Sequence, residues 1–273
     1  MKLLVISPHL DDAALSCAWL LQHHPWSRVV SVFAGMPPNA LTVSTDWDRN
    51  CGFASAGAAI EARRYEDGCA CQKLDADPIW LDFADGQYGR QPRQAALEEQ
   101  FESILEKADG AVVVIPLGLH HPDHIAVSDA ALVALQRQQR TCIAYHETPY
   151  RALPGVVEKR ITCLTAAGFS LQALSELSGS IAWKNGVVET YASQWPRLQI
   201  DALLDARDVL RPERFSTVAT PRQYRRDRPT AVMRSFRRPY LVSSQPQLDK
   251  NHRLLRQSGE GSYERETYED WNS

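Results

Sequence analysis

Two short polar motifs, each placed directly after an apolar run, could bind and use a divalent metal ion. The first is His9-Leu10-Asp11-Asp12-Ala13, which follows the apolar run at residues 3–6. The second is His120-His121-Pro122-Asp123-His124, which follows a β-branched run at residues 111–117. Imidazole and carboxylate groups are ligands that zinc and related divalent ions accept in proteins. The sequence therefore predicts a metal site to which both motifs contribute.

Each apolar run predicts a buried strand, and the residues after each motif predict a helix, over 12–23 and over 123–138. In a doubly wound α/β sheet the first and fourth strands are neighbours, and ligands bind beyond the carboxyl ends of the strands. If residues 111–117 form the fourth strand, then His9, Asp12 and His124 can meet at one ion. Two histidines and one carboxylate leave a fourth position open, which is typical of a catalytic zinc site rather than a structural one.

Each motif taken alone also has an ordinary structural explanation. His9 fits a hydrogen-bonded polar residue after a strand, and Asp11 and Asp12 fit the cap of the helix that begins there. The histidine-rich segment 120–124 fits a surface turn. A metal site is favoured because it explains both motifs together, with suitable ligand types at equivalent strand ends.

Together the motifs resemble the paired signatures of the LmbE-like (PIG-L) zinc-dependent N-acetylglucosaminyl de-N-acetylases. That family carries His-Pro-Asp-Asp-Glu after its first strand and His-Pro-Asp-His after a later one. Residues 121–124 match the second signature fully, whereas Leu10 and Ala13 depart from the first. The resemblance covers residues 1–218 and implies a Rossmann-like three-layer α/β sandwich with a mostly parallel sheet. It also implies a Zn²⁺ cofactor, and Fe²⁺ or Co²⁺ would suit the same ligands.

The chemistry of amide hydrolysis assigns a role to each motif residue. A bound zinc ion lowers the pKa of its water to about 7 and polarises a carbonyl group. If Asp12 is a ligand, Asp11 is free to take the proton of that water as general base. His121 is placed to stabilise the oxyanion or to protonate the leaving amine, and Asp123 could hold one histidine in the right tautomer. The resemblance implies that the substrate is an amino sugar of a glycan, glycolipid or glycosylated metabolite. The group removed is an N-acyl group, and N-acetyl is the one expected.

Three further residues are candidate substrate contacts. Arg63 lies three positions before Glu66, an Arg-x-x-Glu spacing that the family shares, and the alternative is a solvated salt-bridged face. Asp85 corresponds to a family loop residue that contacts the sugar, and the alternative is an Asp-Gly turn. Tyr150 follows an expected strand whose end faces the site, and packing or a turn is the alternative.

The remaining periodicity predicts the elements that surround these residues. Trp47 belongs to a polar segment that is expected to cover the site, and Gln194 is expected to pack near the metal loops. Strands are expected at 28–34, 79–83, 141–145 and, in antiparallel orientation, 157–164; helices are expected at 53–72, 92–107 and, as two or three, within 169–210.

Composition restricts the class of protein. The 273-residue chain has a net charge of −3, so no nucleic-acid partner is expected. It contains neither an apolar run of the roughly 20 residues that span a membrane nor a signal-peptide pattern, so a cytoplasmic location is expected. A C-terminal arm at 219–273, basic and then acidic, would follow the deacetylase domain at 1–218. It is expected to pack on that domain or on a partner subunit, and the alternative is that its basic segment binds a phosphate-bearing substrate or nucleic acid.

A different class of function is a catalytically inactive carbohydrate-binding or assembly protein that retains the fold. Hydrolysis of a phosphoester is disfavoured because no second carboxylate cluster suggests the two-metal site of many phosphatases. Asp11 favours an enzyme, since a site that only binds a metal needs no spare base.

Overall fold

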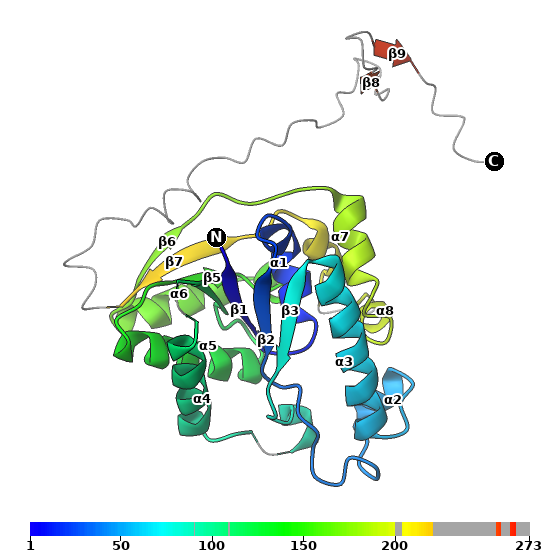
Figure 1. Ribbon diagram of the computed structural model, residues 1–273, viewed down its shortest axis with the longest axis vertical. Helices are drawn as coiled ribbons and strands as arrows, with labels where there is room; N and C mark the ends of the chain where they lie inside the picture. The colour runs from blue at the N-terminus through cyan, green and yellow to red at the C-terminus, as the bar shows by residue number, and fades with distance from the viewer. Residues whose placement is uncertain (90, 109, 200–203, 221–254, 258–262, 266–273) are drawn as a thin grey trace. The chain divides into compact units, whose positions relative to one another are not determined.

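The computed structural model describes residues 1–89, 91–108, 110–199, 204–220, 255–257 and 263–265. Strands and helices alternate along most of the chain (Figure 1). The strands are β1 Leu3–Ser7, β2 Ser27–Ser31, β3 Ala76–Trp80, β4 Val112–Pro116, β5 Cys142–Tyr145, β6 Ser170–Ala173, β7 Phe215–Ala219, β8 Leu255–Gln257 and β9 Tyr263–Arg265. The helices are α1 Asp12–Gln22, α2 Asp46–Asn50, α3 Ala56–Lys73, α4 Gln94–Glu106, α5 Pro122–Arg137, α6 Val156–Ala166, α7 Ile181–Val188 and α8 Trp195–Leu198, with 3₁₀ helices η1 Gly86–Tyr88, η2 Tyr150–Ala152 and η3 Ala206–Leu210.

A seven-stranded sheet has the order β3-β2-β1-β4-β5-β7-β6. Strands β3, β2, β1, β4 and β5 run parallel to one another, whereas β7 is antiparallel to both β5 and β6. This arrangement confirms the mostly parallel α/β sheet and makes the strand of the second motif the direct neighbour of β1. Because both strands run the same way, the two metal-ligand motifs leave the sheet at the same edge.

Alternate residues of β1 contribute to two separate cores. Leu3 and Val5 pack in a core that includes side chains of α1, α3 and α7, whereas Leu4 and Ile6 pack in a core that includes α4 and α5. Figure 1 shows these helices on opposite sides of the sheet. A parallel strand covered on both faces is hydrophobic throughout, which explains why residues 3–6 show no polar alternation. The end of β1 is therefore rigidly placed where the first motif begins.

Helix α1 bends at Cys17, whose φ of −134° and ψ of 16° are not helical. The carbonyl of Leu15 accepts a hydrogen bond from Oγ1 of Thr148 at 3.0 Å. The amide of Trp19 donates to Oε1 of Glu213 at 2.9 Å. Side chains from distant segments thus satisfy backbone groups on either side of the bend.

The strand predicted at 157–164 is wrong, because these residues lie in α6. Val157, Ile161 and Leu164 recur at helical spacing and pack in the core on the α4–α5 side of the sheet. The antiparallel strands come instead from β6, inside the region expected to be helical, and from β7. Strand β3 also begins three residues before the predicted segment, at Ala76. It is an edge strand, which tolerates the proline in its Ala-Asp-Pro-Ile-Trp sequence.

The C-terminal strands β8 and β9 pair in antiparallel orientation and belong to a separate unit, Pro239–Ser273. The boundary predicted at 218 and the arm at 219–273 stay predictions, since most of that arm lies outside the described residues. Among the helices that the structure does describe, none is long and apolar enough to cross a membrane.

Candidate metal centre and active site

Three ligand atoms from the two motifs converge at the carboxyl ends of β1 and β4. Oδ2 of Asp12 lies 3.2 Å from Nδ1 of His9 and 3.2 Å from Nε2 of His124. The two imidazole nitrogens are 3.3 Å apart. A tetrahedral zinc ion with ligands at about 2.0–2.1 Å has neighbouring ligands about 3.3 Å from one another. These residues, named here the ligand triangle, therefore match one face of a tetrahedral metal site.

A buried carboxylate stands behind each histidine of the ligand triangle. Nε2 of His9 lies 3.2 Å from Oδ2 of Asp123, and Nδ1 of His124 lies 3.4 Å from Oε1 of Glu147. A proton on the outer nitrogen of each ring leaves the inner nitrogen with a lone pair for a metal. Asp123 thus orients the imidazole of His9, while the charge of Glu147 stands beside Nδ1 of His124 without a hydrogen bond to it. The histidine whose tautomer Asp123 can hold is His9.

A second group with metal-ligand spacing consists of His9, His121 and Asp123. Its carboxylate is already occupied by donors of the chain. Oδ2 of Asp123 accepts from the amide of Gly86 at 3.2 Å, and Oδ1 accepts from Nε2 of Gln91 at 2.6 Å. Because these bonds and the contact with His9 use both oxygens, we assign Asp123 to the support of the ligand triangle rather than to a metal of its own.

The electrostatics of the ligand triangle favour a cation at its centre. Burial by itself would lower the pKa of His124, but the carboxylate of Asp12 raises this pKa to about 9. Burial by itself would raise the pKa of Asp12, yet His124 and His9 hold the pKa of this carboxyl well below its usual range. Protons balance the charge of the metal-free ligands, and a divalent ion binds by displacing them.

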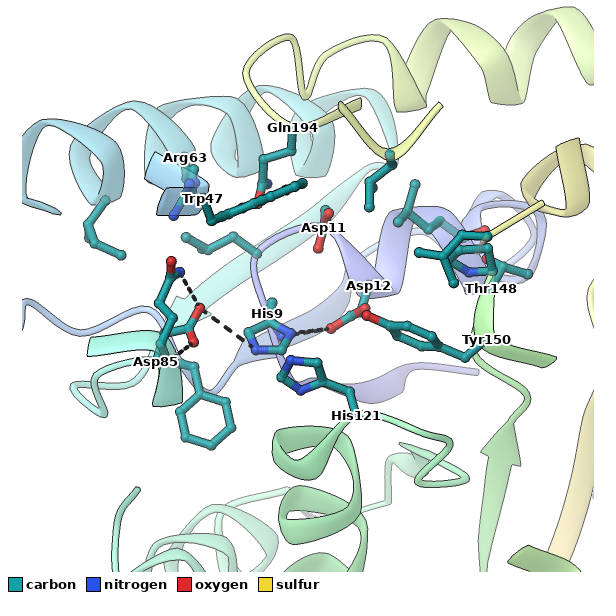
Figure 2. A pocket seen from close by; sticks show the side chains of 18 residues that line it. His9, Asp11, Asp12, Trp47, Arg63, Asp85, His121, Thr148, Tyr150 and Gln194 are labelled. Atoms are coloured by element: carbon teal, nitrogen blue, oxygen red, sulfur yellow. Dashed lines mark hydrogen bonds and ion pairs between the residues drawn. The ribbon is translucent and has the colours of Figure 1, made fainter. Parts of the chain in front are cut away.

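Asp11, the second carboxylate of the first motif, lines a cavity of about 290 Å³ beside the ligand triangle (Figure 2). It occupies the N-cap position of α1 but makes no side-chain cap hydrogen bond, so helix capping does not account for it. Burial and the charge of Asp12 raise the pKa of Asp11 to about 7. A carboxyl group that titrates near neutrality can both accept and return a proton.

His121 caps the helix that carries the third ligand and also lines the cavity. Its Nδ1 accepts the amide hydrogen of Asp123 at 3.2 Å, so in the neutral ring the proton sits on Nε2. Burial and the neighbouring His9 and His124 lower the pKa of His121 to about 4. The ring is therefore a neutral hydrogen-bond donor, which suits the stabilisation of an oxyanion better than the protonation of an amine.

The Arg-x-x-Glu pair of α3 anchors two different walls of the cavity. Arg63 is buried and forms an ion pair with Asp48 of α2 at 3.0 Å, so it is not part of a solvated face. Glu66 accepts hydrogen bonds from the amide and the hydroxyl of Ser193 at 2.8 and 2.7 Å. One residue thus holds helix α2, which carries Trp47, and the other holds the loop that carries Gln194.

Trp47 and Gln194 lie on the side of the cavity opposite the ligand triangle. Figure 2 shows the indole ring of Trp47 edge-on between Arg63 and Gln194, with His9 and Asp85 across the cavity. The segment expected to cover the site therefore contributes one of its walls. Gln194 reaches the cavity itself, beyond the packing role that the sequence suggested.

Asp85 and Tyr150, the other two substrate candidates, also line the cavity. Oδ1 of Asp85 accepts from the amide of Gln87 at 2.9 Å, as in an Asp-Gly turn, while Oδ2 lies 3.9 Å from Nε2 of His9. The turn and the position at the site are therefore compatible. The ring of Tyr150 meets that of His124 edge-on at a centroid distance of 5.1 Å. Contact of these residues with substrate stays a prediction.

Two histidines that neighbour the site in sequence, His120 and His146, lie apart from the ligand triangle. A third residue, Glu147, faces the site although the sequence did not indicate it. His120 is exposed, and His146 bonds Oγ of Ser216 on β7 at 3.0 Å. Glu147, directly beside His146, is the residue that faces the site. Its position directly after β5, the strand next to β4, indicates a residue near the site. The sequence alone does not distinguish it from the neighbouring His146 and Thr148.

The chain is similar to known deacetylases in sequence. Residues 4–135 match the model of the PIG-L family, described as GlcNAc-PI de-N-acetylase. A 2'-N-acetylparomamine deacetylase from Streptomyces fradiae is 29% identical over 214 residues, which are 71% of this chain and 73% of the relative. The range 4–135 that matches the family model includes both motifs, 9–13 and 120–124.

Solved structures of deacetylases share the fold. The zinc-inhibited form of teicoplanin deacetylase Orf2 is 26% identical with a TM-score of 0.67, covering 80% of this chain and 98% of the other. The A40926 pseudoaglycone deacetylase Dbv21 is 26% identical with a TM-score of 0.61, covering 79% and 96%. These similar proteins are deacetylases by name, and one of them is named as a zinc-inhibited form.

Proposed function

We propose that the chain, which belongs to the PIG-L family by the match of residues 4–135, is a zinc-dependent deacetylase, a hydrolase that removes an N-acetyl group from an amino sugar. The observation that carries the proposal is the ligand triangle with Asp11 beside it. Three ligand atoms 3.2–3.3 Å apart suit a divalent ion, and they leave one coordination position for chemistry. Fe²⁺ and Co²⁺ are compatible with the same ligands.

The residues of the chain divide the work of amide hydrolysis among them. A bound divalent ion would supply an acidified water and a polarised carbonyl. Asp11 accepts the proton of the attacking water and, with a pKa near 7, returns it to the departing amine nitrogen. His121 donates a hydrogen bond from Nε2 to the carbonyl oxygen as negative charge develops there. Asp123 keeps His9 oriented throughout.

The cavity walls support an oxygen-rich ring as the substrate. Within the described part of the chain, Nε of Arg63 and Nε2 of Gln194 are buried donors without a hydrogen-bond partner, and both residues line the cavity. Buried donors are normally satisfied, so a ligand with acceptor oxygens complements them. Asp85 offers acceptors, and the face of Trp47 offers an apolar surface for the C–H face of a sugar. The relatives named for 2'-N-acetylparomamine and teicoplanin support the same substrate class.

The test combines metal content with amine release from N-acetylglucosamine-containing compounds and 2'-N-acetylparomamine. We expect close to one metal ion per chain and release of a primary amine. Asp11→Asn should keep the metal and lose about 10²–10⁴-fold in turnover, because a positioned general base contributes about that much. Asp46→Asn, at a carboxylate whose side chain is 94% exposed, is the matched control and should hydrolyse normally.

Two outcomes would contradict the proposal. Asp11→Asn that hydrolyses as fast as the wild type would remove the general base from the mechanism. Metal-loaded protein that binds amino sugars but releases no amine from any of them would favour the binding or assembly protein.

A further inference from the structure

The dipeptide Glu147-Thr148, directly after β5, contacts both segments that carry metal ligands. The carboxylate of Glu147 is fully buried and accepts three consecutive backbone amides. These hydrogen bonds come from Leu117 at 3.1 Å, Gly118 at 2.8 Å and Leu119 at 2.8 Å. The loop between β4 and the second motif is therefore wrapped around one carboxylate.

The backbone of that loop adopts a conformation that favours glycine at residue 118. Gly118 has a φ of +91°, and a Cβ on it would lie 2.8 Å from Cβ of Ser128. The carbonyl of Leu117 is turned away and accepts from Nε of Arg160 at 2.8 Å. Three neighbouring amides that point to one side form a concavity that favours negative charge. The carboxylate of Glu147 is the acceptor for the amides of Gly118 and Leu119, and it shares the amide of Leu117 with the carbonyl of Tyr145 at 2.9 Å.

Thr148 makes the corresponding contact with the first motif. Its amide donates to Oγ of Ser16 at 3.1 Å, and its hydroxyl donates to the carbonyl of Leu15 at 3.0 Å. Both acceptors lie in α1, whose first residue is the ligand Asp12. The same short segment therefore holds the helix of one ligand and the loop that leads to another.

We propose that Glu147 is a positioning residue for the metal and that Glu147 and Thr148 together set metal affinity by clamping the two ligand-bearing segments. Glu147 acts on the loop before α5 and on His124, whose Nδ1 lies 3.4 Å from its carboxylate. Thr148 acts on α1. The inference rests on the proposed function, because it takes the ligand triangle to be the metal site.

The test is the zinc affinity of Glu147→Gln, measured by competition with a chromophoric chelator. The amide keeps the volume but presents N–H groups to backbone donors and removes the charge beside His124. Carboxylates that orient a metal-bound histidine contribute about 10–100-fold to metal affinity, and we expect a loss of that size. The visible spectrum of the Co²⁺-substituted protein should change as well, because it reports the coordination geometry.

The matched control is Asp67→Asn, which also replaces a buried carboxylate by its amide. The partners of Asp67 are Trp80, Tyr191 and Ser31 rather than a metal ligand. Its zinc affinity and Co²⁺ spectrum should equal those of the wild type even where its stability falls. A merely structural role for Glu147 predicts the same behaviour for both variants, and Glu147→Gln that binds zinc as tightly as the wild type overturns the clamp.

Two further variants keep the test decisive. Glu147→Asp retains the charge and shortens the side chain, so it serves if Glu147→Gln does not fold, and unchanged zinc affinity in it overturns the clamp. Thr148→Val removes the hydroxyl donor to α1 and should also weaken zinc binding. Wild-type protein that binds no zinc refutes the proposed function and the clamp together, whereas tight wild-type binding with unaffected variants refutes only the clamp.

Discussion

Two buried clusters of charge adjoin α1, and they differ in whether the chain itself supplies their partners. One is the ligand triangle. In the other, Nζ of Lys184 lies 2.7 Å from Oε1 of Glu213, and both side chains are fully buried. Glu213 also accepts the amides of Trp19 and Leu20 at 2.9 and 3.1 Å. The ammonium group lies 4.5 Å from the centre of the Trp19 ring. This cluster, named here the Lys184–Glu213 pair, balances its charge and satisfies its acceptors within the fold.

The ligand triangle also combines basic side chains with a carboxylate, but the fold does not satisfy all of its polar atoms. Its three inner atoms face a common centre at 3.2–3.3 Å from one another, and the backbone supplies the amide of His9 to Oδ2 of Asp12 at 2.8 Å but no donor to the two imidazole nitrogens within the described residues. A cation is what completes such a group. The comparison teaches that a buried charge indicates structure when the chain completes its partners and indicates function when a ligand must complete them.

The sharpest way to break the ligand triangle is His124→Gln, which keeps most of the volume and removes one ligand. We expect the metal to be lost and amide hydrolysis to fall by more than about 10⁴-fold, because the ion supplies both the nucleophile and the stabilisation of charge. Elemental analysis and an amine-release assay measure the two effects. A variant that keeps one zinc per chain would show that the three residues do not form the metal site.

Breaking the Lys184–Glu213 pair should give the reverse result. Glu213→Gln leaves a buried ammonium group without its counter-charge, which costs about 3–5 kcal/mol in the free energy of unfolding. Zinc affinity of the folded variant should be retained. Urea denaturation measures the loss, and Glu176→Gln, at an exposed ion pair with Arg214, is the control, with an expected cost of about 0–1 kcal/mol. If Glu213→Gln loses its zinc as His124→Gln does, the two clusters are not independent.

Asp67 extends the comparison to a buried acid whose partners are neutral donors. Burial raises the pKa of Asp67 to about 6, against the hydrogen bonds from Trp80, Tyr191 and Ser31. The folded state therefore holds this proton more tightly than the unfolded state, in which the pKa is about 4. Stability from this group is complete below pH about 4 and is lost as the pH rises through about 6.

Asp67→Asn removes that proton, so its stability relative to the wild type should improve as the pH rises from 4 to 7. The change should approach about 3 kcal/mol, which corresponds to the difference between the two pKa values. Urea denaturation at several pH values measures it. A constant difference between variant and wild type across this range would mean that Asp67 has an ordinary pKa in the folded protein.

The smallest effect should come from Trp47, which belongs to neither charged cluster. Trp47→Ala removes an apolar surface that would bury about 50 Å² against a sugar ring, or about 1.3 kcal/mol. We therefore expect KM for an amino-sugar substrate to rise about tenfold, with metal content and stability unchanged. Steady-state kinetics measure this change. A large fall in kcat with an unchanged KM would instead place Trp47 in the chemistry.

Much of the site follows from local sequence. The ligand types, their spacing within each motif and the apolar runs before them are all contained in short segments, so the strands and helices that carry them could be predicted. The predicted neighbour relation of β1 and β4 also holds, because parallel α/β sheets restrict the strand orders that are available. Residues 157–164 lie in a helix although the sequence predicts a strand, because a short apolar stretch fits either element.

The sequence by itself determined the residues that can bind a metal, the spare carboxylate of Asp11 and the edge of the sheet at which they gather. Only the tertiary structure decided their partners. It placed Asp123 on His9, 114 positions away in the chain, and Glu147 behind His124. It also closed the Lys184–Glu213 pair within the fold and placed the atoms of the ligand triangle where they could hold a cation. The physical reason is that residue type and spacing are local properties, whereas hydrogen-bond satisfaction depends on which distant segments the packing brings within about 3 Å.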